Sequence, residues 1–97
     1  MFKMVMIVYN EALDEEVMEV LAQCENKNYT KISGALGKGT SSGTHQGNDT
    51  WPGRNNILYV YCDEQDAKKI LLKTRELRKT LGKEGIKAFL LSAEEST

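Results

Sequence analysis

Residues 57–62, ILYVYC, are apolar or aromatic at every position, and this stretch constrains the fold more than any other. Alternate side chains of a strand point to opposite faces of its sheet, so such a strand is hydrophobic on both faces. In the predicted strand over residues 3–9, KMVMIVY, residues 4–9 have the same property. A sheet of such strands has to be covered on both faces, because a large bare apolar face marks an interface. The pattern predicts helices against one face and further copies of the chain against the other.

The remaining elements follow from periodicity and from signals at their ends. We expect helices over residues 14–25 and 64–81 and weaker strands over residues 29–36 and 86–91. Asp14 and Asp63 are expected to cap the two helices. Strand, helix, strand, long loop, strand, helix, strand is the order of an α+β, ferredoxin-like βαββαβ fold. This fold has a four-stranded antiparallel sheet with both helices on one face.

The chain has 97 residues and a net charge of −1, which fits one domain over residues 1–97 without an overall electrostatic field. We therefore expect no nucleic-acid partner. Tyr59 and Tyr61 could stack RNA bases, but burial between subunits accounts better for them. The apolar run at the N-terminus is too short to span a bilayer and carries no cleavage signal. These features predict a cytoplasmic protein.

The long loop over residues 37–56 collects costly residue types, including the only histidine, proline and tryptophan of the chain. A loop of this length in a small domain is usually functional or disordered. Its glycine amides can form a concavity for an anion, and cationic side chains can add charge-assisted bonds to phosphate or carboxylate. The candidate cations are Lys38, Arg54, Lys83 and Lys87. The alternative is that the glycines serve turn geometry and the lysines are solvated.

The loop opening Gly37-Lys38-Gly39 and the turn GKEG followed by IKAF at residues 82–89 resemble the nitrogen-regulatory P-II proteins. The chain is more closely similar to a divergent P-II-like subgroup with Trp-Pro-Gly-x-Asn before the third strand, here residues 51–55. The resemblance implies a homotrimer whose long T-loop projects outward and whose clefts between subunits bind small effectors. It places Gly37, Lys38 and Gly39 at the T-loop base. It places Lys83, Gly85 and Lys87 around a second segment, the B-loop.

Two departures from the P-II pattern bear on the effector and its control. Residues 80–89 lack the Gly-Asp-Gly of nucleotide-binding members, so the effector stays open between an adenine nucleotide and another small anionic metabolite. No tyrosine lies between Gly37 and Asn56, so the uridylylation of some relatives has no acceptor here. The resemblance implies a signalling role in nitrogen regulation. The T-loop residues Ser41, His45 and Trp51 would then meet a membrane transporter or an enzyme.

The alternative functions are a metal protein and an enzyme. The related trimeric CutA proteins, which confer metal tolerance, suggest His45 as a metal ligand. One histidine without a second local ligand is, however, a poor zinc signature. No Ser-His-Asp group, activated cysteine pair or carboxylate pair is visible, so we expect no catalytic activity. A plain interaction scaffold without a ligand is the third alternative.

Overall fold

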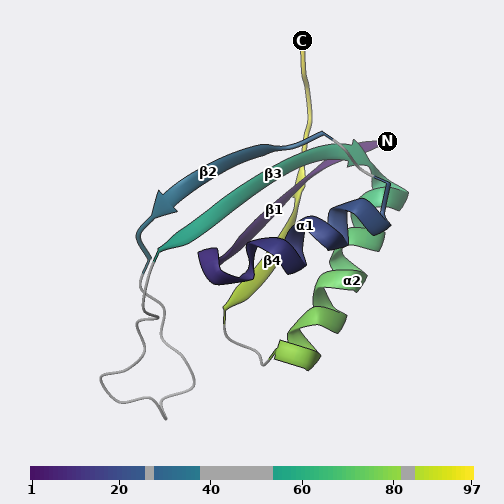
Figure 1. Ribbon diagram of the computed structural model, residues 1–97. Helices are drawn as coiled ribbons and strands as arrows, with labels where there is room; N and C mark the ends of the chain where they lie inside the picture. The colour runs from purple at the N-terminus through teal and green to yellow at the C-terminus, as the bar shows by residue number, and fades with distance from the viewer. Residues whose placement is uncertain (26–27, 38–53, 82–84) are drawn as a thin grey trace, which may run out of the picture.

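The computed structural model describes residues 1–25, 28–37, 54–81 and 85–97, which form one sheet with two helices (Figure 1). The elements in chain order are β1 (Phe2–Asn10), η1 (Glu11–Leu13), α1 (Asp14–Gln23), β2 (Thr30–Ala35), β3 (Asn55–Asp63), α2 (Glu64–Leu81) and β4 (Ile86–Ser92). The strand order is β2-β3-β1-β4, with every neighbouring pair antiparallel. Figure 1 shows α1 and α2 on the same side of the sheet. The predicted ferredoxin-like α+β fold is confirmed.

The core lies between the sheet and the helices, and it follows the period-two pattern of the central strands. Alternate residues of β1 and β3 point into it, and helical residues at i, i+3 and i+4 spacing close it from the other side. The largest fully buried side chains are Tyr9, Ile7, Leu58, Ile70, Val5, Val17 and Val60. Cys24 and Cys62 are buried free thiols in the same core. Burial raises the pKa of both thiols.

The other face of the sheet is apolar as well, and no described element covers it. Met4, Met6 and Val8 of β1 lie beside Tyr61, Tyr59 and Ile57 of β3 in register. Phe89 and Leu91 of β4 and Ile32 of β2 extend the same face. We call this surface the open face. Its large exposed members include Phe2 at 49% and Tyr61 at 43%, with ring centroids 5.0 Å apart. The expectation that the strands are apolar on both faces is confirmed.

The first helix begins at Asp14 as predicted, but the prediction that Asp14 caps it was wrong. Asp14 is the first residue of α1, but the N-cap position is Leu13, and no side chain caps the helix there. The turn η1 comes first, and the Asn10 side chain accepts the Ala12 amide at 2.9 Å to begin it. Asp14 does not cap because its carboxylate is bound by side chains from the sheet. Asp63 does accept the Glu64 amide, at 2.8 Å, where α2 begins.

The predicted bounds of α2 are confirmed, whereas each strand differs from expectation by one or two residues at one or both ends. The predicted loop over residues 37–56 was too long at its end, because Asn55 and Asn56 belong to β3. They pair with Asn10 and Tyr9 of β1, and Asn56 is buried. The pairing of β2 with β3 shifts register between Ile32 and Ala35, and Gly34, which lies between them, has φ 74°.

Candidate functional site

The candidate site lies at the end of the sheet where β1 stops. The Asn10 amide donates to the Gly85 carbonyl at 2.8 Å, and the next amide, that of Glu11, donates to the Arg54 carbonyl at 2.9 Å. Arg54 comes directly before β3, and Gly85 directly before β4. Two consecutive amides therefore fix the backbone at the start of two strands. These are the strands that follow the predicted T-loop and B-loop.

The sequence at residues 10–12 explains why these two amides are available. Asn10 turns the chain out of the sheet, because its side chain accepts the Ala12 amide and begins η1. Asparagine favours such turns because its short amide can replace a backbone acceptor. The amides of Asn10 and Glu11 therefore lie where β1 ends. They donate to the backbone carbonyls directly before the two neighbouring strands, β4 and β3.

Gly85 and Lys87 form one part of the site, on β4 and just before it. Gly85 is buried with φ 102°, a backbone conformation that only glycine adopts without strain. Lys87 is exposed and pairs with Val8 across the sheet. Its Nζ lies 5.8 Å from the ring centroid of Phe89. The Lys87 ammonium group is thus presented at the open face, where a second copy of the chain can reach it.

Gly37 and Arg54 form the other part of the site, on the β2 side. A Cβ atom on Gly37 would lie 2.9 Å from Nδ2 of Asn55, so this position has little room for a side chain. The Arg54 side chain lies against Gly34, where an ideal Cβ would be 3.8 Å from both Cδ and Nη1 of the arginine. Arg54 therefore leans toward β2, whereas Lys87 stands on β4. β3 and β1 lie between these two strands, so the two cations of one subunit lie at different sides of the sheet.

Six of the predicted site residues lie outside the described residues: Lys38, Gly39, Ser41, His45, Trp51 and Lys83. The Trp-Pro-Gly-x-Asn stretch is described only at Arg54 and Asn55. The roles of these six residues therefore stay predictions.

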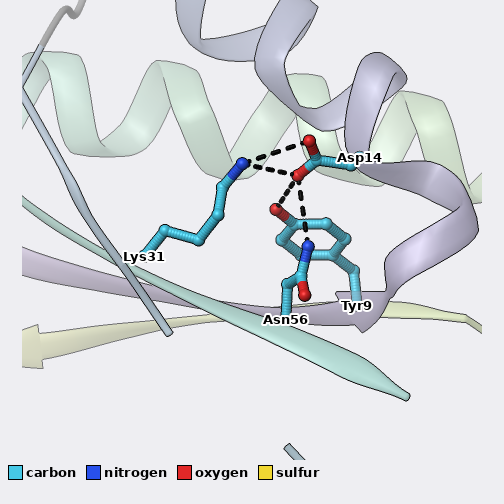
Figure 2. Close-up of polar contacts among 4 residues, drawn as sticks. All are labelled: Tyr9, Asp14, Lys31 and Asn56. Carbon is cyan, nitrogen blue, oxygen red and sulfur yellow. Dashed lines mark hydrogen bonds and ion pairs between the residues drawn. The ribbon is translucent and has the colours of Figure 1, made fainter. Parts of the chain in front are cut away.

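A polar cluster that sequence reasoning missed lies next to the site (Figure 2). The Asp14 carboxylate accepts a hydrogen bond from the Tyr9 hydroxyl at 2.5 Å and one from Nδ2 of Asn56 at 3.3 Å. Nζ of Lys31 lies 2.9 Å from Oδ1 and 3.1 Å from Oδ2 of the same carboxylate. We call Tyr9, Asp14, Lys31 and Asn56 the Asp14 cluster. A charged residue at a core-facing position of β2 was the signal that could have revealed it.

The Asp14 cluster shifts the ionisation of two of its members. Burial alone would raise the pKa of the Asp14 carboxyl, but the hydrogen bonds from Lys31 and Tyr9, the Lys31 charge and the Asn56 amide hold it below its usual range. Burial, together with the hydrogen bond to Asp14, strongly raises the pKa of the Tyr9 hydroxyl. At neutral pH the Asp14 carboxyl is therefore ionised and the Tyr9 hydroxyl is protonated.

Comparison with known proteins shows which family this chain belongs to. The family described as Nitrogen regulatory protein P-II matches residues 2–96. The chain belongs to the P-II family. This description is that of a regulatory protein rather than an enzyme. No curated protein sequence matches this P-II chain significantly.

Solved structures of P-II-like proteins share the fold of this chain. CPII from Thiomonas intermedia K12, a nitrogen regulatory PII-like protein, superposes in its apo form with a TM-score of 0.73 at 15% identity, over 95% of this chain and 88% of that one. Its complex with ADP, AMP and bicarbonate gives 0.71 at 16% identity, over 98% and 94%. A PII-like protein from Thermus thermophilus gives 0.69 at 24% identity, over 95% and 85%.

Two further observations bear on the alternatives. Within residues 1–25, 28–37, 54–81 and 85–97, no three His, Cys, Asp or Glu side chains are grouped so that they could hold a metal ion. His45, the predicted metal ligand, is outside these ranges. In the same ranges no helix is long and apolar enough to cross a membrane.

Proposed function

We propose that this P-II protein is a signalling regulator that binds a small anionic effector in clefts between subunits. It then acts on a partner protein through residues 37–54, its T-loop. The observation that carries the proposal is the convergence of Arg54 and Gly85 on the consecutive amides of Asn10 and Glu11. A ligand held at this point contacts the bases of both loops at once. Its binding is thereby coupled to the conformation of the T-loop.

The chemistry of the described residues suits an anion. Arg54 and Lys87 both carry exposed cationic groups, and a guanidinium can bind phosphate or carboxylate through two parallel hydrogen bonds. Lys38, Gly39 and Lys83 would add a cation, a backbone amide and another cation on the adjoining segments. CPII, which shares this fold, binds ADP, AMP and bicarbonate, all of them anions. An adenine nucleotide is therefore the effector we test first.

The proposal includes a homotrimer, because the two described cations of the site, Arg54 and Lys87, are separated across the sheet within one subunit. Arg54 of one copy leans toward β2, whereas Lys87 of the same copy lies on β4, the opposite edge strand. Packing of the open faces brings the β4 edge of one copy near the β2 edge of the next. Burial of side chains such as Phe2, Ile32 and Tyr61 supplies the driving force. The cleft then combines Arg54 of one subunit with Lys87 of its neighbour.

The remaining parts of the proposal concern the partner and its setting. Ser41, His45 and Trp51 of the T-loop are the residues we expect a partner to meet. The proposed partner is a membrane transporter or an enzyme, and the proposed setting is the cytoplasm. The family description, Nitrogen regulatory protein P-II, supports a role in nitrogen regulation.

Titration calorimetry tests the proposal with ATP, ADP, AMP, cyclic AMP and bicarbonate on protein shown by light scattering to be a trimer. We expect saturable binding of at least one nucleotide. Arg54→Ala and Lys87→Ala should each weaken it about tenfold, since a charge-assisted bond to an anion contributes about 1.5 kcal/mol or more. Lys69→Ala, an exposed lysine of α2, is the matched control and should bind like the parent. A verified trimer that binds none of these compounds would contradict the proposal.

A further inference from the structure

The carboxylate of Asp14 joins helix α1 to three of the four strands. Tyr9 belongs to β1, Lys31 to β2 and Asn56 to β3, and all three donate to this one carboxylate (Figure 2). The sequence separations are 5, 17 and 42 residues. A contact of this kind is tertiary, and it does not help to form the helix itself.

The two strands on either side of the T-loop, β2 and β3, are held in place by this contact to different degrees. β3 lies in the middle of the sheet, between β1 and β2. β2 is an edge strand, and its backbone pairs with β3 alone. That pairing is broken by the register shift between Ile32 and Ala35, close to the point where the loop begins. The ion pair between Lys31 and Asp14 is therefore the tether that holds β2 to the helix layer.

The position of the Asp14 cluster relative to the effector site follows from the register. Asn56 is two residues from Arg54 along the chain, and Tyr9 is followed directly by Asn10, whose amide holds Gly85. Lys31 lies on the strand that leads to Gly37. Lys31 and Asn56 of the cluster thus lie on the same chain segments as the described site residues of the β2 side, Gly37 and Arg54. None of the four cluster members is itself one of the site residues.

We propose that Asp14 is a positioning residue for the effector site: by binding Lys31 and Asn56 it fixes both stems of the T-loop relative to β1. This inference rests on the proposed function. When the carboxylate is lost, the edge strand is free to move against β3. Gly37 and Arg54 then lose their fixed placement relative to Gly85, so a ligand must order them as it binds. The ordering cost weakens the affinity without removing any group that contacts the ligand.

Two variants weaken the cluster with little change in shape. Asp14→Asn keeps the size of the side chain but removes its charge, and Lys31→Met keeps most of the chain length without the ammonium group. We expect each to bind the best nucleotide about tenfold more weakly at neutral pH. The double variant should be no weaker than the single ones, because both remove the same ion pair. Lys31→Arg, which can still pair with the carboxylate, should restore most of the affinity.

Ile70→Val is the control for lost stability, because Ile70 is fully buried in α2 and outside the cluster. All binding is measured well below the unfolding temperature of each variant. Affinity that falls equally in Ile70→Val and Asp14→Asn, or that stays unchanged in Asp14→Asn, would overturn the inference.

A second readout separates this inference from the proposed function. Amide hydrogen exchange of Glu11, whose amide donates to Arg54, reports the fixed loop base without any ligand. We expect faster exchange at Glu11 and Ile32 in Asp14→Asn than in Ile70→Val. If the parent protein binds no nucleotide, the proposed function fails, while this exchange difference still decides whether Asp14 fixes the loop base. Equal exchange in the two variants would rule that role out.

Discussion

The Tyr9 hydroxyl donates a hydrogen bond of 2.5 Å to Oδ1 of Asp14, and Tyr9 is fully buried. A polar group at this depth needs its partner, because an unsatisfied buried donor or acceptor costs about 1–3 kcal/mol. Tyr9 meets this need with a carboxylate that two other donors also bind. The bond therefore joins the core of the domain to the contacts of Asp14 with Lys31 of β2 and Asn56 of β3.

Tyr9→Phe should lower the free energy of unfolding by about 1.5–3 kcal/mol, the range for a hydrogen bond to a charged group. The ring stays buried, so the loss reports the hydroxyl alone. Urea unfolding at one fixed protein concentration measures it, because the stability of an oligomer depends on concentration. Tyr29→Phe is the matched control, since Tyr29 is 46% exposed, and its effect should stay within about 0.5 kcal/mol. Equal effects of the two changes would show that the Tyr9 bond contributes nothing.

The stability contributed by Asp14 should depend on pH. The pKa of its carboxyl is lower in the folded than in the unfolded chain, so the unfolded chain binds more protons and stability rises with pH. This contribution is complete above the unfolded pKa of 3.8 and is lost as the pH falls through the lower, folded pKa. The difference in unfolding free energy between the parent protein and Asp14→Asn should therefore be larger at neutral pH than in strong acid.

Urea unfolding of both proteins across the acidic range checks this dependence. The comparison with Asp14→Asn cancels the other carboxyl groups, which titrate in both proteins. A difference that stays constant from neutral pH into strong acid would mean that Lys31 and Asn56 do not favour the charged form of Asp14.

Gly34→Ala should destabilise the fold by about 1–2 kcal/mol through the backbone alone, because a left-handed φ is strained for a residue with a Cβ. Gly34 has φ 74°, and an added Cβ would meet Arg54 only at an ordinary contact distance of 3.8 Å. Gly34→Asn should cost less, since asparagine tolerates this conformation better. Thermal unfolding of the two variants measures the order. An alanine variant as stable as the parent would mean that β2 can straighten at the register shift.

The alternation of β1 and β3 made most of the fold predictable. Ile7, Leu58 and Val60 face the core because every second residue must, and the same rule placed Met6 and Tyr59 on the open face. The sequence alone was sufficient to predict these positions, because the pleat of a strand determines which side chains face the core.

The Asp14 cluster was not predictable, because a local rule competed with distant contacts. An aspartate before two glutamates is typical of a helix cap, yet the Asp14 carboxylate is taken up by Lys31 and Asn56 from far along the chain. Asn56 was assigned to the loop for the same reason, since asparagine usually marks turns. Asn56 lies two residues before Leu58 and therefore on the core-facing side of β3. This position indicated a buried strand residue, whereas the turn propensity of asparagine indicated a loop.

Met6→Glu should convert the proposed homotrimer into monomers, and this tests whether the open face forms the subunit contacts. Met6 lies on the central strand β1, between Tyr59 of β3 and Phe89 of β4. In a lone subunit the new carboxylate reaches water, but packing of the open faces would bury it unpaired, at a cost of several kcal/mol. The molar mass measured by light scattering should then fall from three times the chain mass of 10.9 kDa to the mass of one chain. Leu72→Glu makes the same chemical change on α2, where Leu72 is 52% exposed, and should leave the mass unchanged. A Met6→Glu protein that keeps the parent mass would place the subunit contacts elsewhere on the domain.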